Sequence, residues 1–515
     1  MTLAHQVRLA GALAAGAASV FGFAPFNLPA VPIVTMALLF ALWLPATPRV
    51  AAQTGFAFGV GLFGAGASWV YVAINTFGGM PWFLAAIGTA IWTAYLALFP
   101  ALTGWLAARF APEGSIARAL CAAAIWTLAE IFRGTGYTGF PWLALGYAQL
   151  PIGAEALASP LAGYATIGGV GLVTLAVVLC AALLALAIDA FPIRARERLA
   201  ALAIAALAIV GGGAIATTIG WTAPVGKPVA ISLVQGDVAQ DLKFEPAVRD
   251  QTYQLYLDLV GKSRGRLIVL PESAFPVFAD EVPDPVLIEL LRNATARHGD
   301  VLVGMFTAEP PLPGHEQMRY YNSVVTLGEG EVQLYRKRHL VPFGETIPIE
   351  PVVGWFIRAV LAIPISDQSA GDPRQVPLDV AGQKVAMTIC YEDAFGGELR
   401  AQAAASTLIV NVTNDAWYGR SLAAEQHNQI AAMRALEAAR PLVRATNTGI
   451  TSAFDYDGRE LARLPWFTRG ILEVTLSGRT GTTPYVRWGD AIPLALSALL
   501  VVVAFTARRR SRRFR

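Results

Sequence analysis

The stretch V-A-M-T-I-C-Y-E-D, residues 385–393, places a cysteine at the end of an apolar, β-prone run. A run that stops abruptly at polar residues is typical of a buried strand that delivers a side chain to a surface or cleft. Cys390 is therefore a candidate nucleophile. A free cysteine is also often a small buried hydrophobic residue, and this stretch alone does not decide between the two interpretations.

Two further stretches add the groups that a thiol nucleophile needs. Residues 267–273, L-I-V-L-P-E-S, form an apolar run that breaks at a proline and presents Glu272. Residues 335–345, Y-R-K-R-H-L-V-P-F-G-E, place Lys337 before an apolar turn and a second carboxylate, Glu345. A carboxylate, an ammonium and a thiol supply the base, the oxyanion-stabilising cation and the nucleophile of thiol-based acyl transfer.

The order Glu272, Lys337, Cys390 in these contexts resembles the Glu-Lys-Cys triad of the nitrilase, or carbon-nitrogen hydrolase, superfamily. Within it the sequence is most similar to the membrane-embedded branch, the apolipoprotein N-acyltransferases, which N-acylate bacterial lipoproteins. The same resemblance covers nearly the whole chain, membrane segments included. It extends to three more motifs: H-L-V-P-F-G-E at 339–345, N-D-A-W-Y-G at 414–419 and T-G-F-P-W-L at 138–143.

Composition indicates a membrane protein with a soluble-like middle. The chain has 515 residues, of which 55% are hydrophobic, and a mean hydropathy of +0.51, which is too apolar for a soluble protein of this size. Residues 1–224 hold 8 Lys and Arg against 5 Asp and Glu, residues 225–500 hold 25 against 31, and the remaining tail holds 6 against none. A mildly acidic domain therefore lies between apolar segments, and nothing suggests nucleic-acid binding.

Eight apolar segments are predicted to be transmembrane helices, because a span needs about 20 mostly apolar residues. The first two are short, and residues 50–108 contain no charged residue. We expect seven spans in residues 1–224, a catalytic domain at 225–488, and a last span with a basic tail at 489–515. The predicted spans are 9–23, 32–44, 53–74, 82–108, 117–132, 164–190, 199–221 and 490–507.

The distribution of arginines predicts the orientation, because cytoplasmic loops carry the excess of Lys and Arg. With the N-terminus inside, the outer loops before the large domain hold only Arg133. The large domain is then expected to face the periplasm from the bacterial inner membrane. The tail R-R-R-S-R-R-F-R is interpreted as a topogenic anchor, with a nucleic-acid or partner site as the alternative. The inner loops hold Arg49, Arg109, Arg118, Arg194, Arg196 and Arg198.

From residue 228 onward, short β-rich runs alternate with helical stretches, which predicts an α/β layered domain. Spacing alone does not distinguish a doubly wound sheet from other layered folds, but the resemblance implies the four-layer α-β-β-α sandwich of nitrilases. Helices are predicted at 281–298 and 423–440. Strands are predicted at 229–234, 267–270, 301–305, 323–327, 385–390 and 408–412.

Supporting roles around the triad come partly from the resemblance. A carboxylate at Glu345 would orient the Lys337 ammonium and hold it charged, although without the family pattern a surface acid is the simpler interpretation. The resemblance implies that Tyr391 and Glu392 supply backbone N–H groups to an oxyanion and orient the site. His339 invites a Cys-His interpretation, but its context offers no orienting partner, and it is not assigned to catalysis.

Two tryptophans are candidate substrate-binding residues. Trp142 lies in a loop that is rich in Gly, Pro and aromatic residues, where an interfacial aromatic belt is the alternative. Trp417 would cover a lipid entrance or fill the core. Nearby, Glu130 and Arg133 are expected at the membrane interface or paired with each other, because charges inside lipid are costly.

The expected function is a ping-pong acyl transfer through a Cys390 thioester. The resemblance implies a membrane phospholipid as donor and the N-terminal amine of a diacylglyceryl-cysteine apolipoprotein as acceptor. A membrane-tethered amidase with the same triad is the alternative, and a non-enzymatic transporter or scaffold is disfavoured by the near absence of charge within the spans. No metal or cofactor is expected, since no Cys or His cluster has ligand spacing.

Overall fold

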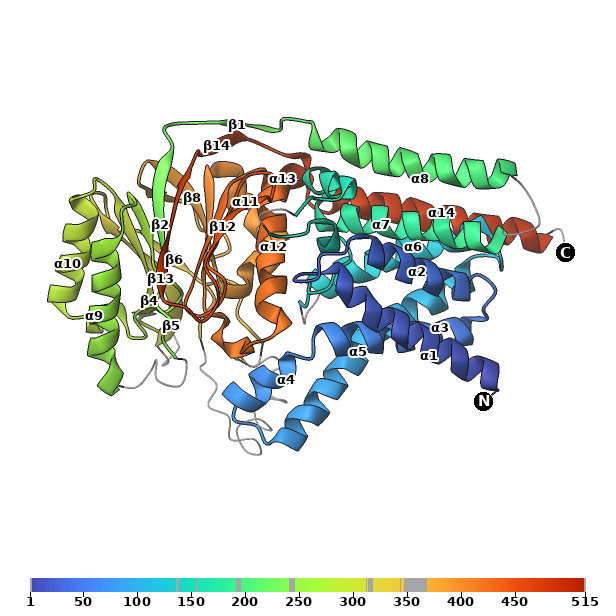
Figure 1. The fold of residues 1–515 in the computed structure, drawn as a ribbon, viewed down its shortest axis with the longest axis horizontal. Helices are drawn as coiled ribbons and strands as arrows, with labels where there is room; N and C mark the ends of the chain where they lie inside the picture. The colour runs from blue at the N-terminus through green and yellow to red at the C-terminus, as the bar shows by residue number, and fades with distance from the viewer. Residues whose placement is uncertain are drawn as a thin grey trace. The chain divides into compact units, whose positions relative to one another are not determined.

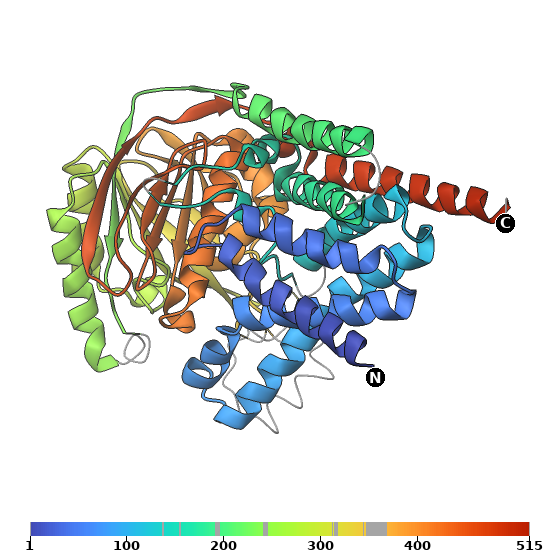
Figure 2. The same ribbon diagram turned by 45° about the vertical axis from the view of Figure 1, so that its right-hand side comes forward.

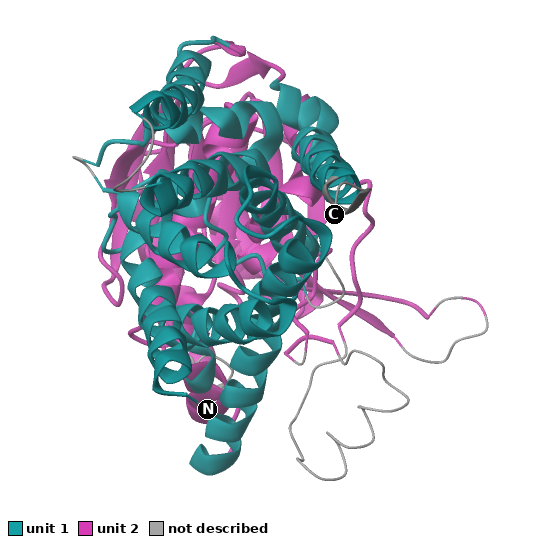
Figure 3. Ribbon diagram, turned by 90° about the vertical axis from the view of Figure 1, so that its right-hand side faces the viewer, with its two compact units in different colours: residues 1–71, 81–220, 483–515 teal, residues 72–80, 221–482 magenta. Residues whose placement is uncertain are grey.

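The computed structural model describes two compact units, shown in different colours in Figure 3. Unit 1 consists of Met1–Tyr71, Pro81–Gly220 and Thr483–Arg515, and unit 2 of Val72–Met80 and Trp221–Thr482. The described residues are 2–135, 139–153, 156–190, 196–239, 246–311, 313, 318–342, 344–346 and 368–513.

Unit 1 is built from helices, the element whose backbone hydrogen bonds are all internal to one segment. Glycines let these helices approach closely: a Cβ on Gly16 would lie 2.0 Å from the Phe58 carbonyl oxygen, and one on Gly61 would lie 2.1 Å from the Leu13 carbonyl oxygen. Figure 2 shows the helices side by side. They are α1 (Leu3–Ser19), α2 (Ala30–Trp43), α3 (Pro48–Gly66), α5 (Trp82–Phe110), α6 (Ile116–Thr135), α7 (Ala165–Ala190), α8 (Arg196–Thr217), α13 (Pro484–Trp488) and α14 (Ala491–Arg513).

Helices form at all eight predicted places, but fewer than eight are long and apolar enough to cross a membrane. Within the described residues, four helices have the length and composition of a membrane span: Trp82–Phe110, Pro160–Ala190, Arg196–Thr217 and Ala491–Arg510. A fifth is possible if α3 and the helical pair α4 (Val70–Val72) and η2 (Ala73–Phe77) are one span.

The prediction of one continuous helix over 53–74 is wrong. Helix α3 ends at Gly66, and the chain resumes in α4 and η2 after a bend of 59°. The break falls at G-A-S, where Gly and Ser have weak helix propensity and a Gly/Ser pair is a common site of a kink. By its contacts, the segment beyond the bend belongs to unit 2.

The two charged residues near the end of α6 are buried and bind a loop. Glu130 accepts hydrogen bonds from Trp126 Nε1 at 2.8 Å, from Thr174 Oγ1 at 2.8 Å and from the Leu145 backbone N–H at 3.2 Å. Arg133 Nη1 donates to the carbonyl oxygens of Phe140 and Trp142, each at 2.6 Å. Each charge is thus satisfied by hydrogen bonds of its own, as a buried charge requires.

Unit 2 contains two six-stranded sheets and a two-stranded ribbon of β1 (Thr222–Pro224) with β14 (Arg479–Gly481). The first sheet has the order β13-β2-β3-β4-β5-β6, and the second has the order β12-β11-β10-β9-β8-β7. The first is made of β13 (Gly470–Leu476), β2 (Val229–Gln235), β3 (Leu267–Val269), β4 (Asp300–Glu309), β5 (Arg319–Gly328) and β6 (Leu334–Arg336). The second is made of β12 (Glu460–Arg463), β11 (Ser452–Phe454), β10 (Leu442–Thr446), β9 (Leu408–Thr413), β8 (Gln383–Ile389) and β7 (Leu378–Val380).

Each sheet has three parallel strands in its interior, and these carry the most buried side chains. β2, β3 and β4 run parallel in the first sheet, and β8, β9 and β10 in the second. Every residue of β3, β9 and β10 is buried, as expected for parallel strands covered on both faces. The carboxyl ends of such strands point to one edge, where loop side chains meet.

Helices cover the outer face of each sheet, so unit 2 is the four-layer α-β-β-α sandwich that the resemblance implied (Figure 1). Helices α9 (Pro246–Lys262) and α10 (Asp284–Thr295) pack on the first sheet. Helices α11 (Gly396–Ala405) and α12 (Leu422–Ala438) pack on the second. The predicted α/β layers and six predicted strands are confirmed, with three differences: β4 continues to Glu309 rather than ending at 305, β5 begins at Arg319 rather than at 323, and Cys390 follows β8 instead of ending it.

Candidate active site

Cys390 is the first residue of the 3-10 turn η8 (Cys390–Ala394), directly after the buried strand β8. Its φ is +55°, a left-handed conformation that costs a residue with a Cβ about 1–3 kcal/mol and persists only when its surroundings enforce it. Asn411 Nδ2, from the neighbouring strand β9, donates to the Cys390 carbonyl oxygen at 2.9 Å. The strand and the turn therefore hold the thiol in one orientation.

Glu392 ties this turn to the segment that carries the lysine. One carboxylate oxygen accepts from the backbone N–H groups of Arg338 at 2.6 Å and His339 at 3.0 Å. The other accepts from the Ile389 N–H at 2.6 Å and the Tyr335 hydroxyl at 3.0 Å. Burial raises the pKa of Glu392 to about 7, and these backbone N–H donors oppose the rise. The Glu392 side chain thus fixes the backbone on both sides of the site.

Lys337 follows the edge strand β6 and is almost completely buried, at 1% exposure. Its Nζ lies 2.7 Å from Glu345 Oε1 and 3.4 Å from Glu272 Oε1. Burial disfavours the ammonium, but the Glu345 and Glu272 carboxylates outweigh it and raise the pKa of Lys337 well above its usual value. The lysine is therefore a fixed positive charge.

Glu272 stands just past β3, beyond Pro271, and is 6% exposed. Its Oε1 accepts from Asn322 Nδ2 at 2.7 Å, and the Asn322 carbonyl oxygen accepts from the Lys337 N–H at 2.8 Å. Asn322 of β5 thus touches both the carboxylate and the lysine backbone, and sequence reasoning missed it. In the sequence, the only signal was an Asn directly before the β-prone run at 323–327.

The Cys390 thiol shares this cluster with Glu272 and Lys337. Burial raises the pKa of the thiol, and so does the Glu272 charge, whereas Lys337 and a hydrogen bond from the Thr413 hydroxyl lower it. The resulting pKa of the Cys390 thiol lies above the usual value for a cysteine. The thiol is therefore protonated at rest, and a neighbouring carboxylate is the group placed to accept its proton.

The structure brings Glu345 against Lys337, as described, and places Tyr391 in the turn immediately after the thiol. The His339 ring stacks on Phe395 with centroids 3.7 Å apart, and its Nδ1 lies 3.0 Å from Glu398 Oε1. His339 is thus bound to a carboxylate outside the triad. Within the described residues, no group of three or more His, Cys, Asp and Glu side chains is placed to hold a metal ion.

The two candidate tryptophans differ in environment. Trp142, in unit 1, is 1% exposed and packs against Trp69 and Phe140, with centroids 5.8 and 5.6 Å away. Trp417, in unit 2, is 42% exposed on η9 (Asp415–Tyr418), with the Phe77 ring 6.0 Å away. Two motif residues, Thr138 and Phe343, lie outside the described residues.

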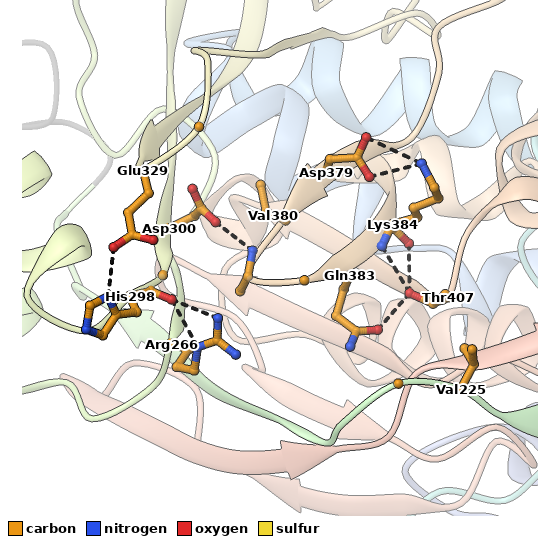
Figure 4. A pocket seen from close by; sticks show the side chains of 15 residues that line it. Val225, Arg266, His298, Asp300, Glu329, Asp379, Val380, Gln383, Lys384 and Thr407 are labelled. Carbon is orange, nitrogen blue, oxygen red and sulfur yellow. Dashed lines mark hydrogen bonds and ion pairs between the residues drawn. The ribbon is translucent and has the colours of Figure 1, made fainter.

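A hollow of about 470 Å³ lies at the opposite end of the strands (Figure 4). Gln383, the first residue of β8, lines it, so the seven residues of β8 separate it from Cys390 by roughly 20 Å. Its charged side chains are bound to one another or to backbone: Lys384 to Asp379 at 3.0 Å, and His298 to Glu329 at 2.8 Å. This hollow is separate from the candidate active site.

Comparison with known proteins matches both parts of the chain. Residues 232–485 match the family model described as "Carbon-nitrogen hydrolase", and residues 15–183 match "Apolipoprotein N-acyltransferase N-terminal domain". The apolipoprotein N-acyltransferase of Nitrosomonas europaea is 47% identical over 509 residues, covering 98% of this chain and 99% of that protein. The chain belongs to the apolipoprotein N-acyltransferase family. It is therefore an acyltransferase with a nitrilase-like domain.

A second full-length relative belongs to the same family. The apolipoprotein N-acyltransferase of Methylococcus capsulatus is 42% identical over 502 residues, covering 97% of this chain and 96% of that protein. The crystal structure of Saccharomyces cerevisiae Nit3, a nitrilase superfamily member, is similar with a TM-score of 0.37 and 15% identity, covering 49% of this chain and 91% of that chain. The resemblance read from the motifs is confirmed by the family models and by the full-length relatives.

Proposed function

We propose that this acyltransferase moves an acyl chain from a membrane phospholipid to the N-terminal α-amine of a diacylglyceryl-cysteine apolipoprotein, through a Cys390 thioester. The observation that carries the mechanism is the buried Lys337 ammonium, held between Glu345 and Glu272 and acting electrostatically on the Cys390 thiol. A base, a fixed cation and a nucleophile in one buried cluster are the groups of acyl transfer.

In the first half-reaction, Glu272 accepts the Cys390 proton and the thiolate attacks an ester carbonyl carbon of the phospholipid. Lys337 and the Tyr391 backbone N–H stabilise the oxyanion of the tetrahedral intermediate. The carbon–oxygen ester bond breaks, the departing alkoxide takes the proton from Glu272, and a lysophospholipid leaves. The acyl group remains on Sγ as a thioester.

In the second half-reaction, the apolipoprotein α-amine attacks the thioester carbonyl carbon. Glu272 accepts a proton from the amine, the carbon–sulfur bond breaks, and the proton returns to the thiolate. An amide and the resting thiol are the products. Transfer is favoured over the alternative amidase, because the chain belongs to a family of acyltransferases.

We propose that Trp417 and Phe77 contact the acyl chains. Trp417 follows the turn after β9, directly before Tyr418, and its exposed side chain faces the Phe77 ring. The next residue, Tyr418, is also sensitive to the nucleophile, because its pKa is raised well above the usual value by burial and by the charge at Cys390. The turn that carries Trp417 therefore supports a role for this tryptophan close to the reaction. For Trp142, burial among aromatic rings supports a role in packing unit 1.

We propose a multi-pass location in the bacterial inner membrane with unit 2 in the periplasm. The support is the arginine bias: Arg508, Arg509 and Arg510 follow the apolar part of helix α14, and Arg109 lies in the last turn of α5. Arg194, part of the same bias, lies outside the described residues. A periplasmic site has no access to acyl-CoA, which favours a lipid donor.

The test uses purified protein in nanodiscs that contain phospholipid with labelled acyl chains, with and without a synthetic diacylglyceryl-cysteine peptide. The proposal predicts label on the peptide α-amine in many turnovers, and at most one acyl group per enzyme when the peptide is absent. Release of free labelled fatty acid over many turnovers without the peptide would establish the hydrolase instead.

A further inference from the structure

Four ionisable side chains beside the Cys390 turn take no part in the proposed chemistry, and each is at most 2% exposed: Asp393, Asp415, His427 and Arg444. Arg444 Nη1 lies 2.9 Å from Asp393 Oδ2, and its Nη2 lies 2.9 Å from Asp415 Oδ2. His427 Nε2 lies 2.7 Å from Asp393 Oδ1, and its Nδ1 lies 3.0 Å from Asp415 Oδ1. Both side chains therefore bridge the same two carboxylates, and Arg444 Nη2 also lies 2.7 Å from His427 Nδ1.

The charges of this cluster balance when His427 is protonated. Burial and the Arg444 charge disfavour the imidazolium, but Asp393 and Asp415 outweigh them, so the pKa of His427 is raised. Burial disfavours the Asp415 carboxylate, but Arg444 and His427 outweigh it and lower its pKa. Two positive and two negative buried charges then compensate each other, which burial of this kind requires.

The cluster joins the two turns that border the nucleophile. Asp393 belongs to η8, the turn that begins with Cys390. Asp415 begins η9, two residues after the last residue of β9, Thr413. Because Arg444 of β10 binds both carboxylates, it ties the ends of β8 and β9 together.

Thr413 links the cluster to the thiol. Ile389 and Val412 are register partners in the parallel strands β8 and β9, so the next residues, Cys390 and Thr413, lie side by side, and a hydrogen bond from the Thr413 hydroxyl lowers the pKa of the thiol. Thr413 Oγ1 also lies 3.4 Å from Asp415 Oδ1. A hydroxyl has one proton to donate, so Asp415 and a Cys390 thiolate compete for it. Other groups already occupy the Asp415 carboxylate. Arg444 Nη2 donates to its Oδ1 at 3.2 Å and to its Oδ2 at 2.9 Å, and His427 Nδ1 lies 3.0 Å from Oδ1.

We infer that Asp393, Asp415, His427 and Arg444 form a positioning cluster that saturates the Asp415 carboxylate and so leaves the Thr413 proton for the Cys390 thiolate. This inference rests on the proposed function only in taking Cys390 as the nucleophile. The Arg444 charge also interacts electrostatically with the Cys390 charge, and the inferred positioning effect is the part that is transmitted through Thr413.

The test measures the rate of Cys390 alkylation by iodoacetamide against pH, by intact mass, in a full-length Cys121→Ala, Cys180→Ala background. Thr413→Val keeps the shape and removes the donor, so alkylation should be about tenfold slower below its midpoint, which should move to higher pH. Thr413→Ser should restore the original profile. Arg444→Met should slow alkylation in the same direction as Thr413→Val.

Non-additivity distinguishes this role from a general loss of stability. If Arg444 acts through Thr413, the double variant should be no slower than the slower single variant. Arg434→Met is the matched control: it breaks an equally buried ion pair on α12, Arg434 with Glu437 at 2.9 Å, and should leave the alkylation profile unchanged. If Arg444→Met does not fold, Arg444→Lys is the second variant. It retains the positive charge but cannot bind both carboxylates through two separate nitrogens, so it should shift the alkylation midpoint less far in the same direction.

An alkylation profile of Thr413→Val that is identical to that of the parent would overturn the inference. A double variant that is slowed by the product of the two single-variant factors, those of Thr413→Val and Arg444→Met, would also overturn it. Failure of the proposed function has a different signature. If fully alkylated parent protein still transferred acyl chains to the peptide, Cys390 would not be the nucleophile, whatever the alkylation profiles showed.

Discussion

Nζ of Lys337 lies 2.7 Å from Oε1 of Glu345, closer than the 3.4 Å to Oε1 of Glu272. The lysine is therefore held mainly by a carboxylate that is not the proposed base. Glu345 is itself anchored, because its Oε2 accepts the Val341 N–H at 2.9 Å. This arrangement keeps the cation charged and leaves Glu272 able to accept a proton.

Removing the Glu345 charge should impair acylation without weakening lipid binding. In Glu345→Gln the ammonium loses its shorter contact and pairs more fully with Glu272, which becomes a weaker base. We expect kcat for acyl transfer to fall about tenfold to a hundredfold with KM unchanged. The control is Glu460→Gln, which loses an ion pair to Arg463 on β12, the edge strand of the second sheet. A higher KM at constant kcat would contradict the orienting role.

Asn322 should matter because its Nδ2 donates to Glu272 Oε1 at 2.7 Å. Asn322→Leu retains the approximate volume but removes the donor that orients the carboxylate, so we expect kcat to fall about tenfold or more. Steady-state kinetics with labelled phospholipid and acceptor peptide measure this loss. Asn293→Ala, which removes an amide that hydrogen-bonds to Glu289 and Arg297 rather than to the triad, is the control. Equal effects of the two substitutions would leave Asn322 without a catalytic role.

The pH dependence of Cys390 reactivity should respond in opposite directions to the two charged neighbours. The Glu272 charge raises the thiol pKa and the Lys337 charge lowers it. The alkylation midpoint should therefore move to lower pH in Glu272→Gln and to higher pH in Lys337→Met, while acyl transfer falls in both. Lys384→Met, which loses only a surface pair with Asp379, should leave the midpoint unchanged. Shifts of the same sign would contradict the assigned positions of charge.

Trp417 should affect lipid use rather than thiol chemistry. Trp417→Ala removes a large, partly exposed apolar surface beside Phe77, so KM for phospholipid should rise several-fold while the alkylation profile of Cys390 stays unchanged. Phe77→Ala should act in the same direction. Trp488→Ala, which truncates another exposed tryptophan, in unit 1, is the control. An altered alkylation profile would instead place Trp417 among the groups that hold the turn.

Local patterns predicted the strands that end at the site. β3, β8 and β9 are short apolar runs bounded by Pro271, Cys390 and Asn414, and each was predicted to within one or two residues. The strand β10 was not predicted, because L-V-R-A-T has Arg444 at its centre, and a charge does not suit a buried strand. Only the fold supplies Asp393 and Asp415 as its partners.

The same limit applies to the site. Glu272, Lys337 and Cys390 were proposed from motifs, whereas Asn322 stands 50 residues from its partner Glu272 and lies in no motif. The bend after α3 was missed because residues 53–74 contain no charged residue and hydropathy does not report helix direction, although the local G-A-S sequence favours a kink. Contacts between distant segments decide the position of Asn322, and a single sequence does not show them.

The central claim is a covalent acyl group on Cys390, and intact mass measures it directly. Purified protein is exposed to phospholipid without acceptor, and the mass is recorded before and after hydroxylamine. The account predicts one added acyl mass that hydroxylamine removes, that Cys390→Ala lacks, and that disappears when the diacylglyceryl-cysteine peptide is added. An unmodified mass in protein that nonetheless acylates the peptide would contradict the thioester mechanism.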